Sequence, residues 1–261
     1  MKSTILFITA LFSISLVAAD FEETRKFSLD AKDISKLFID CGAGYLKITG
    51  MGDSEKIFVT AKIEMDNIDL DDAERILEKY LELYLEERGS RAELVSSFEK
   101  SHNFFSSIFS SHGNVRVNLT VEVPEKMNVE IDDGSGFIEV NNIYGKLFID
   151  DGSDYIDIKD NRGNIEIDDG SGDINIRNTK GNIEIDDGSG DIEIENIVGN
   201  INLDDGSGSI KVMEIDGTVR VDDGSGSISI RNVEEDVIIE DDGSGGLSIR
   251  DIAGTVYRYD D

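Results

Sequence analysis

Residues 163–180 read Gly-Asn-Ile-Glu-Ile-Asp-Asp-Gly-Ser-Gly-Asp-Ile-Asn-Ile-Arg-Asn-Thr-Lys, and close variants of this segment fill the second half of the chain. The second copy of its pentapeptide Asp-Asp-Gly-Ser-Gly ends in Asp154 instead of glycine, and successive copies are 18 residues apart, except the last, which is 19. A fixed period this short is typical of one supersecondary unit stacked on itself. The seven copies start at Asp132, Asp150, Asp168, Asp186, Asp204, Asp222 and Asp241.

Each unit carries two Ile-x-Ile tripeptides nine residues apart, separated by turn residues. Alternation with a period of two indicates a strand with one buried face. The sequence therefore predicts a mainly β fold: a parallel β-solenoid of 18-residue coils with two short strands per coil. A third inward position is mostly apolar, as at Ile143 and Ile197, but holds Asn161 and Thr179 in two units. The extra residue within Val237–Glu240 predicts a β-bulge in the last full coil.

The first half has a different pattern, which predicts an N-terminal α+β capping region over residues 20–127, before a solenoid over 128–261. Leu37–Ile48 reads as a degenerate first coil in which Cys41, expected to be buried, replaces the second aspartate. Ile57–Ile63 and Val115–Val123 alternate as strands do.

A helix is expected from Asp69 to about Arg88, because acids stand at its start, an apolar stripe follows, and Gly89 then ends it. The Ser- and Phe-rich segment 99–113 holds both histidines, His102 and His112. Neither has a cysteine or a third histidine nearby, so a metal site there is a weak prediction.

The order of these parts is an N-terminal apolar leader, a glycine-turn strand pair, a helix-bearing insertion, a Val-x-Val-x-Leu-x-Val-x-Val-Pro strand at 115–124, and tandem Ser-Gly-x-Ile-x-Ile coils. In this order the chain resembles the bacterial putative-adhesin family of β-strand-repeat proteins, whose biochemical function is undefined. The resemblance covers nearly all of the chain after the leader. It implies a β-solenoid and supplies no catalytic residues.

Residues 1–19 combine Lys2, a short apolar run and Ala18-Ala19, which predicts a secretory signal peptide and a periplasmic or secreted protein without a membrane span.

The net charge of −31 disfavours nucleic acid and anionic lipid as binding partners. Cations, cationic peptides or a basic protein surface are the expected partners, and the oligomeric state is left open.

Stacking would place the first aspartates of the pentapeptides in one column and the second aspartates in another beside it. Carboxylates about 4.8 Å apart repel by about 0.9 kcal/mol in water. Asx-turn hydrogen bonds, shared protons or bridging Ca²⁺ would each offset this repulsion. The coil resembles the Ca²⁺-binding RTX roll in its length but lacks the Gly-Gly-x-Gly-x-Asp motif. The candidate Ca²⁺ ligands are Asp133, Asp151, Asp169, Asp187, Asp205, Asp223 and Asp242.

These features predict a non-enzymatic, exported envelope protein: an adhesin-like binding scaffold that presents a repetitive acidic edge and needs no cofactor. One alternative is an adhesion or matrix module stabilised by Ca²⁺. Another is a carbohydrate-active enzyme, because paired carboxylates about 5 to 9 Å apart cleave glycosidic bonds. A repeated column, however, offers no unique pair.

Overall fold

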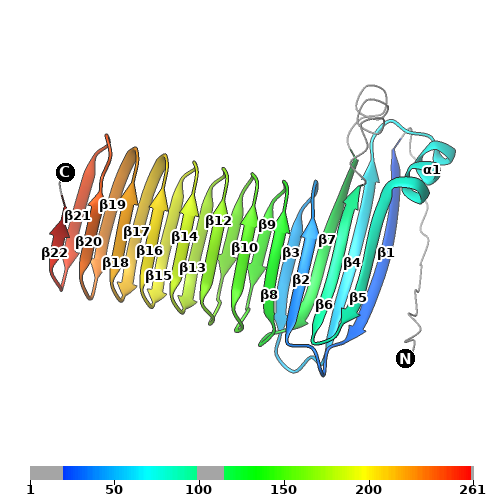
Figure 1. Cartoon of the computed structure of the whole chain (residues 1–261), viewed down its shortest axis with the longest axis horizontal. Helices are drawn as coiled ribbons and strands as arrows, with labels where there is room; N and C mark the ends of the chain where they lie inside the picture. The colour runs from blue at the N-terminus through cyan, green and yellow to red at the C-terminus, as the bar shows by residue number, and fades with distance from the viewer. Residues whose placement is uncertain (1–19, 99–114, 260–261) are drawn as a thin grey trace.

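The structure is a computed structural model that describes residues 20–98 and 115–259. The expected signal peptide and the segment with both histidines lie outside the described residues. Two 11-stranded sheets run side by side along an elongated rod, with the N-terminal strands at one end and the C-terminal strands at the other (Figure 1). The predicted mainly β solenoid is confirmed.

One sheet, called sheet A, holds the second strand of each coil. Its strands follow one another in the order β1 (Phe21–Asp30), β4 (Lys56–Met65), β7 (Val115–Pro124), β3 (Leu46–Met51), β9 (Ile138–Asn141), β11 (Ile156–Lys159), β13 (Ile174–Lys180), β15 (Ile192–Val198), β17 (Gly208–Asp216), β19 (Gly226–Val233) and β21 (Leu247–Ile252).

The other sheet, called sheet B, holds the first strand of each coil. Its order is β22 (Val256–Arg258), β20 (Val237–Asp241), β18 (Val219–Asp223), β16 (Ile201–Asp205), β14 (Ile183–Asp187), β12 (Ile165–Asp169), β10 (Leu147–Asp151), β8 (Asn128–Asp133), β2 (Lys36–Cys41), β6 (Arg91–Phe98) and β5 (Leu81–Arg88).

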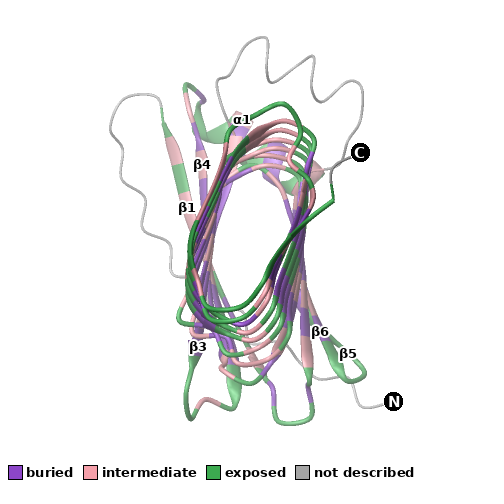
Figure 2. Ribbon diagram, turned by 90° about the vertical axis from the view of Figure 1, so that its left-hand side faces the viewer, coloured by how far each residue is buried: buried purple, intermediate pink, exposed green. Residues whose placement is uncertain are grey.

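Successive coils pair in parallel and in register, so that like residues lie above one another. Ile165 pairs with Ile183 in sheet B, and Ile174 pairs with Ile192 in sheet A. The view along the rod shows the two sheets as the long walls of a flattened tube, with buried residues recurring along both walls (Figure 2). The predicted inward aliphatics are buried there, except in the last coil, where Leu247, Ile249 and Ile252 are half-buried. Asn161 and Thr179 are buried too, each 1% exposed. The core is therefore one continuous apolar column between the sheets.

The N-terminal region extends both sheets. β2 and β3 pair in parallel with β8 and β9, which confirms the degenerate first coil. The expected strands over 57–63 and 115–123 are β4 and β7, which pair antiparallel. Strands β1 and β6 were not expected from the sequence: β1 pairs antiparallel with β4, and β6 pairs antiparallel with β5.

The prediction of a helix from Asp69 to about Arg88 is wrong in its second half. Helix α1 covers only Leu70–Tyr80; Asp69 caps it, because its carboxylate accepts a hydrogen bond from the Asp72 N–H. The chain then continues as β5 and turns at Gly89, whose φ is +70°, into β6. Leu81, Leu83 and Leu85 alternate as in a strand, and a full ladder with β6 and the burial of Leu85 outweigh their helix propensity.

No helix among the described residues is long and apolar enough to cross a membrane. At the other end of the rod, the pairing of β18 with β20 shifts by one residue after Val221, which confirms the predicted bulge.

Candidate functional site: two aspartate columns

The parallel register stacks the aspartates of the repeat, as the sequence predicts. Asp150 pairs with Asp168, and Asp151 pairs with Asp169; the same two pairings recur from β8 through β18. We call the first aspartates the outer column: Asp132, Asp150, Asp168, Asp186, Asp204, Asp222 and Asp241. We call the second aspartates the inner column: Asp133, Asp151, Asp169, Asp187, Asp205 and Asp223. Adjacent members lie one strand spacing apart, about 4.8 Å.

The outer column lies on the solvent face of sheet B. Its members are exposed, apart from the half-buried Asp222. Partial desolvation and then the charges of the stacked neighbours Asp132 and Asp168 raise the pKa of Asp150. Asp222 has a raised pKa for the same two reasons. The column is therefore a row of like charges open to solvent along most of the solenoid.

A shallow groove with a volume of about 260 Å³ lies on the same face. Phe148, Glu166 and Glu184, which are in register on β10, β12 and β14, contribute to its lining. Each precedes its outer-column aspartate by two residues, so all of them point to the same side of the sheet. The groove offers an aromatic ring and two carboxylates next to the outer column, and Lys146 also lines it.

The inner column lies inside the coil, and its members are between 0% and 3% exposed. In each, Oδ1 accepts a hydrogen bond from the backbone N–H of the serine two residues later, at 3.1 Å for Asp169 and Ser171. The other five turns have the same bond, at 2.9 to 3.3 Å. This is an Asx-turn, one of the three ways of offsetting the repulsion that the sequence suggests, and it stabilises the turn from within.

The second oxygen of each inner-column carboxyl, Oδ2, is buried and has no hydrogen-bond partner. Burial, followed by the charges of Asp133 and Asp169, raises the pKa of Asp151 to about 7. Burial likewise raises the pKa of Asp187 to about 7 and that of Asp169 to about 6. Buried carboxyls with pKa values this close to neutrality hold protons at mildly acidic pH, so the column is a chain of partly protonated acids.

The two ends of the inner column differ from its middle. At the N-terminal end Cys41 pairs with Asp133, and burial raises the pKa of its thiol well above the usual value. The prediction that Cys41 is buried is confirmed. At the C-terminal end, beyond the bulge, Asp242 is half-buried and forms an ion pair with Arg258 at 2.8 Å.

The structure thus separates residues that the sequence reasoning placed on one acidic edge. Only the outer column faces solvent, because consecutive residues of a strand point to opposite sides. Of the seven candidate Ca²⁺ ligands, six are buried inside the coil and Asp242 is half-buried. Within residues 20–98 and 115–259, no three His, Cys, Asp or Glu side chains converge closely enough to hold a metal ion.

The sequence reasoning also missed the conformation of the second turn. One residue of each unit has a positive φ there, between 57° and 60°, and it is usually asparagine or aspartate. Asn196 Nδ2 donates to Asn178 Oδ1 at 2.8 Å, and Asn178 Nδ2 donates to Asp160 Oδ1 at 3.1 Å. Asparagine recurring every 18 residues was the available signal, because it tolerates this conformation better than most residues.

The chain is similar to several solved structures at low sequence identity. One is a putative adhesin from Bacteroides fragilis, with 15% identity, a TM-score of 0.44, and coverage of 91% of this chain and 97% of that chain. Another is a putative cell adhesion protein from Clostridium sporogenes, with 16% identity, a TM-score of 0.30, and coverage of 92% and 98%. A third is a putative lipid binding protein from Parabacteroides distasonis, with 14% identity, a TM-score of 0.42, and coverage of 92% and 97%.

No curated protein matches the chain. The family model described as Toastrack DUF4097 matches residues 78–249, which is more than half of the chain. The glycine turns and inward aliphatics on which the resemblance to β-strand-repeat proteins was based lie mostly within this range. That resemblance is confirmed, and the chain belongs to the Toastrack DUF4097 family.

Proposed function

We propose that this protein is a non-enzymatic binding scaffold of the cell envelope, exported to the periplasm or the exterior, whose outer column binds cationic partners. The observation that carries the proposal is the in-register row of exposed aspartates on sheet B, from Asp132 to Asp204. Stacked carboxylates repel by about 0.9 kcal/mol per neighbouring pair in water. A partner with spaced positive charges relieves this repulsion at each contact.

The ligand class follows from the surface beside the column. The groove lined by Phe148, Glu166 and Glu184 adds two carboxylates and a ring, on which a lysine or arginine side chain can rest. The strand spacing fixes the repeat of the charges at about 4.8 Å. An extended cationic peptide, or a basic surface of another protein, matches this arrangement better than a single small ion.

A binding role also agrees with the repetition of the site. Each middle carboxylate of the outer column has the same kind of neighbours above and below it, as Asp168 has in Asp150 and Asp186. Glycosidase chemistry needs one pair of carboxyls with unequal environments, one acid and one base or nucleophile. A screen against acidic and neutral glycans for released reducing ends tests the carbohydrate-active alternative.

The binding proposal is tested with a labelled lysine decapeptide as the probe and fluorescence anisotropy as the readout. The test variant carries Asn at Asp150, Asp168, Asp186 and Asp204. The control removes the same number of charges from exposed positions outside sheet B's outer column: Glu74, Glu78, Glu82 and Glu87 to Gln.

We expect the outer-column variant to bind at least about tenfold more weakly, which is about 1.4 kcal/mol, while the control changes affinity far less. The difference should shrink as salt is added, because exposed charges are screened. Equal losses in the two variants would mean that only net charge matters, and the outer column would then not be the binding surface.

A Ca²⁺-stabilised module is the second candidate, and the unpartnered Oδ2 atoms of the inner column favour it. Carboxylate oxygens are preferred Ca²⁺ ligands, and an ion between two coils would neutralise the column. Thermal melts with millimolar Ca²⁺ and with a chelator test this idea. A melting temperature that rises with Ca²⁺ in the wild type, but not in Asp169→Asn/Asp187→Asn, supports it; an unchanged midpoint in the wild type excludes it.

A further inference from the structure

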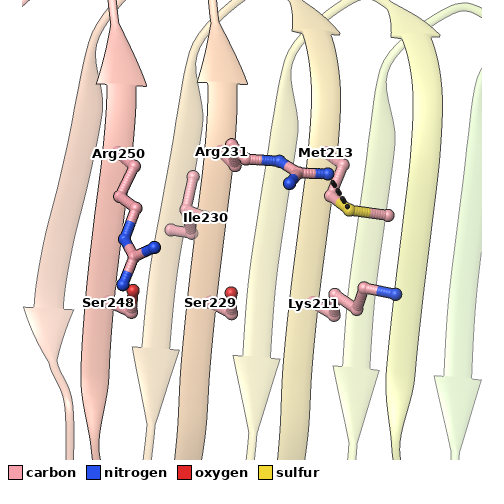
Figure 3. A pocket seen from close by; sticks show the side chains of 7 residues that line it. All are labelled: Lys211, Met213, Ser229, Ile230, Arg231, Ser248 and Arg250. Atoms are coloured by element: carbon pink, nitrogen blue, oxygen red, sulfur yellow. Dashed lines mark hydrogen bonds between the residues drawn. The ribbon is translucent and has the colours of Figure 1, made fainter.

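A cluster of cationic side chains lies on the outer face of sheet A, near the C-terminal end of the rod. Ser229 and Arg231 on β19 pair in register with Ser248 and Arg250 on β21. Residues two apart on a strand point to the same side, so both serines and both arginines face solvent. Figure 3 shows the Arg250 guanidinium turned back toward Ser248, while Arg231 reaches across to Met213 on β17.

These side chains line a groove with a volume of about 480 Å³, which we call the cationic groove; Lys211 and Met213 also contribute to it. The groove is open, and Arg231, Arg250 and Ser229 are all exposed. Its floor includes Ile230, which is 1% exposed. The groove therefore presents guanidinium groups and serine hydroxyls on a backbone that is held by the pairing of the strands.

The two arginines lack the partners that the other arginines have. Within the described residues, every other arginine lies against a carboxylate or an aromatic ring. Arg231 donates only to the Met213 sulfur at 3.3 Å, and no described carboxylate lies within ion-pair distance of Arg231 or Arg250. A thioether is a weak acceptor. In a chain with 56 acids and 25 lysines and arginines, unpaired arginines on adjacent strands are unexpected.

Lys211, in contrast, has an ion-pair partner. Its ammonium pairs with Glu193 at 2.6 Å, and in Figure 3 it points away from the serines. The excess positive charge of the groove therefore comes from Arg231 and Arg250. The two side chains extend from strands about 4.8 Å apart, and in Figure 3 their guanidinium groups point in different directions, so an anion that binds both would draw them together.

We propose that the cationic groove binds a carboxylate or sulfate group of an acidic oligosaccharide. A guanidinium binds such oxyanions through two parallel hydrogen bonds, and two guanidinium groups can share one anion. The hydroxyls of Ser229 and Ser248 lie beside them and can donate to the same anion or to neighbouring sugar hydroxyls. This inference does not depend on the proposed function of the outer column, which lies on the opposite sheet.

An oligosaccharide fits better than a membrane or a nucleic acid. An anionic bilayer or a duplex carries dense negative charge over a wide area, and it would meet the many carboxylates of a chain with a net charge of −31. Glu193 and Glu195 lie only one strand beyond Lys211 and Met213 on the same face. A narrow chain with spaced acidic groups can occupy the groove alone.

The test measures binding of labelled galacturonic acid oligomers and sulfated dextran oligomers to the full chain, with neutral dextran and phosphatidylglycerol vesicles as comparisons. The groove variant is Arg231→Gln/Arg250→Gln. The control, Arg177→Gln/Arg220→Gln, makes the same change in charge at arginines of other coils that pair with Asp157 and Glu240. Ser229→Ala/Ser248→Ala removes the hydroxyls without changing the charge.

We expect wild type to bind one or both acidic oligomers and not neutral dextran. The groove variant should lose at least about tenfold in affinity, the serine variant less, and the control little. Far-ultraviolet circular dichroism and melting temperature verify that each variant is folded. Absence of binding by wild type, equal losses in groove variant and control, or binding of vesicles in place of the oligomers would each overturn the proposal.

Discussion

Asp168 and Asp169 are neighbours in the sequence, but their side chains lie on opposite faces of β12. Asp168 is exposed on the outer face of sheet B, whereas Asp169 is 2% exposed inside the coil and accepts a hydrogen bond from Ser171. The same division recurs in each coil from β8 to β18. Two chemically identical residues therefore have different roles: one is available to partners, and the other holds the turn.

The inner column predicts that stability falls as pH rises from about 4 to about 8. Burial raises the pKa of Asp151 and Asp187 to about 7, above the value of about 3.9 in an unfolded chain. The folded chain therefore binds more protons than the unfolded chain over this interval. The stabilisation is complete below the unfolded pKa and is lost as pH rises through the folded pKa. We expect a higher melting temperature at pH 5 than at pH 8.

Replacing inner-column carboxyls with amides should weaken this pH dependence. Asp169→Asn/Asp187→Asn keeps an oxygen that can accept from Ser171 and Ser189, removes two ionisable groups, and adds amide donors beside unpartnered Oδ2 atoms. We expect a melting temperature above that of wild type at pH 8 and a smaller change between pH 5 and pH 8. Asp168→Asn/Asp186→Asn is the matched control. Identical pH profiles for the two variants would contradict this account.

Gly190 has no room for a side chain. Its φ is +152°, and a Cβ atom there would lie 1.7 Å from the carbonyl oxygen of Gly172 in the preceding coil. Gly190→Ala should therefore destabilise the fold by at least about 2 kcal/mol, since both the conformation and the contact are unfavourable. Gly134→Ala is the control, because a Cβ atom there meets nothing within 4 Å. Urea unfolding of both variants measures the difference; equal midpoints would refute the steric argument.

Asp154 occupies the equivalent position in the second copy, and its φ is +109°. Residues with a Cβ atom rarely adopt this conformation, so the backbone is strained there. Asp154→Gly should stabilise the protein by about 1 kcal/mol, as read from urea unfolding at constant pH. A loss of stability would show that interactions of the Asp154 side chain outweigh the strain of its backbone.

Glu214 is the least suitable residue in the column of positive φ at the second turn. Its φ is +60°, whereas the corresponding residues in the adjacent coils are Asn196 and Asn232. Glu214→Asn should stabilise the protein by about 0.5 to 1 kcal/mol and extend the amide ladder between coils. The reverse change, Asn196→Glu, should cost a similar amount and also break the bond to Asn178. Thermal melts of the two variants should shift in opposite directions.

The solenoid was predictable because its signal repeats. Period-two alternation and a fixed spacing together placed Ile165, Ile167, Ile174 and Ile176 inside the coil, and the extra residue near Glu240 marked the bulge. The turn bond from Ser171 to Asp169 was also predictable, because it depends on residues two apart.

The N-terminal region was less predictable because its strands depend on distant partners. Leu81–Arg88 carries residues that also suit a helix, and only its ladder with β6 decides in favour of a strand. β1 is held in the sheet by its antiparallel pairing with β4, about 35 residues later in the chain. The cationic groove was missed for a related reason: Ser-Ile-Arg at 229–231 and at 248–250 becomes one site only when β19 and β21 pair.

The repeating backbone contacts have a consequence for how such a chain can change its length. Each middle coil pairs with the coil above it in the same register as with the coil below it, so these contacts do not depend on where in the rod a coil lies. A duplication or deletion of 18 codons would therefore lengthen or shorten the rod by about 4.8 Å without disturbing its cross-section. The number of repeats therefore sets the length of the solenoid.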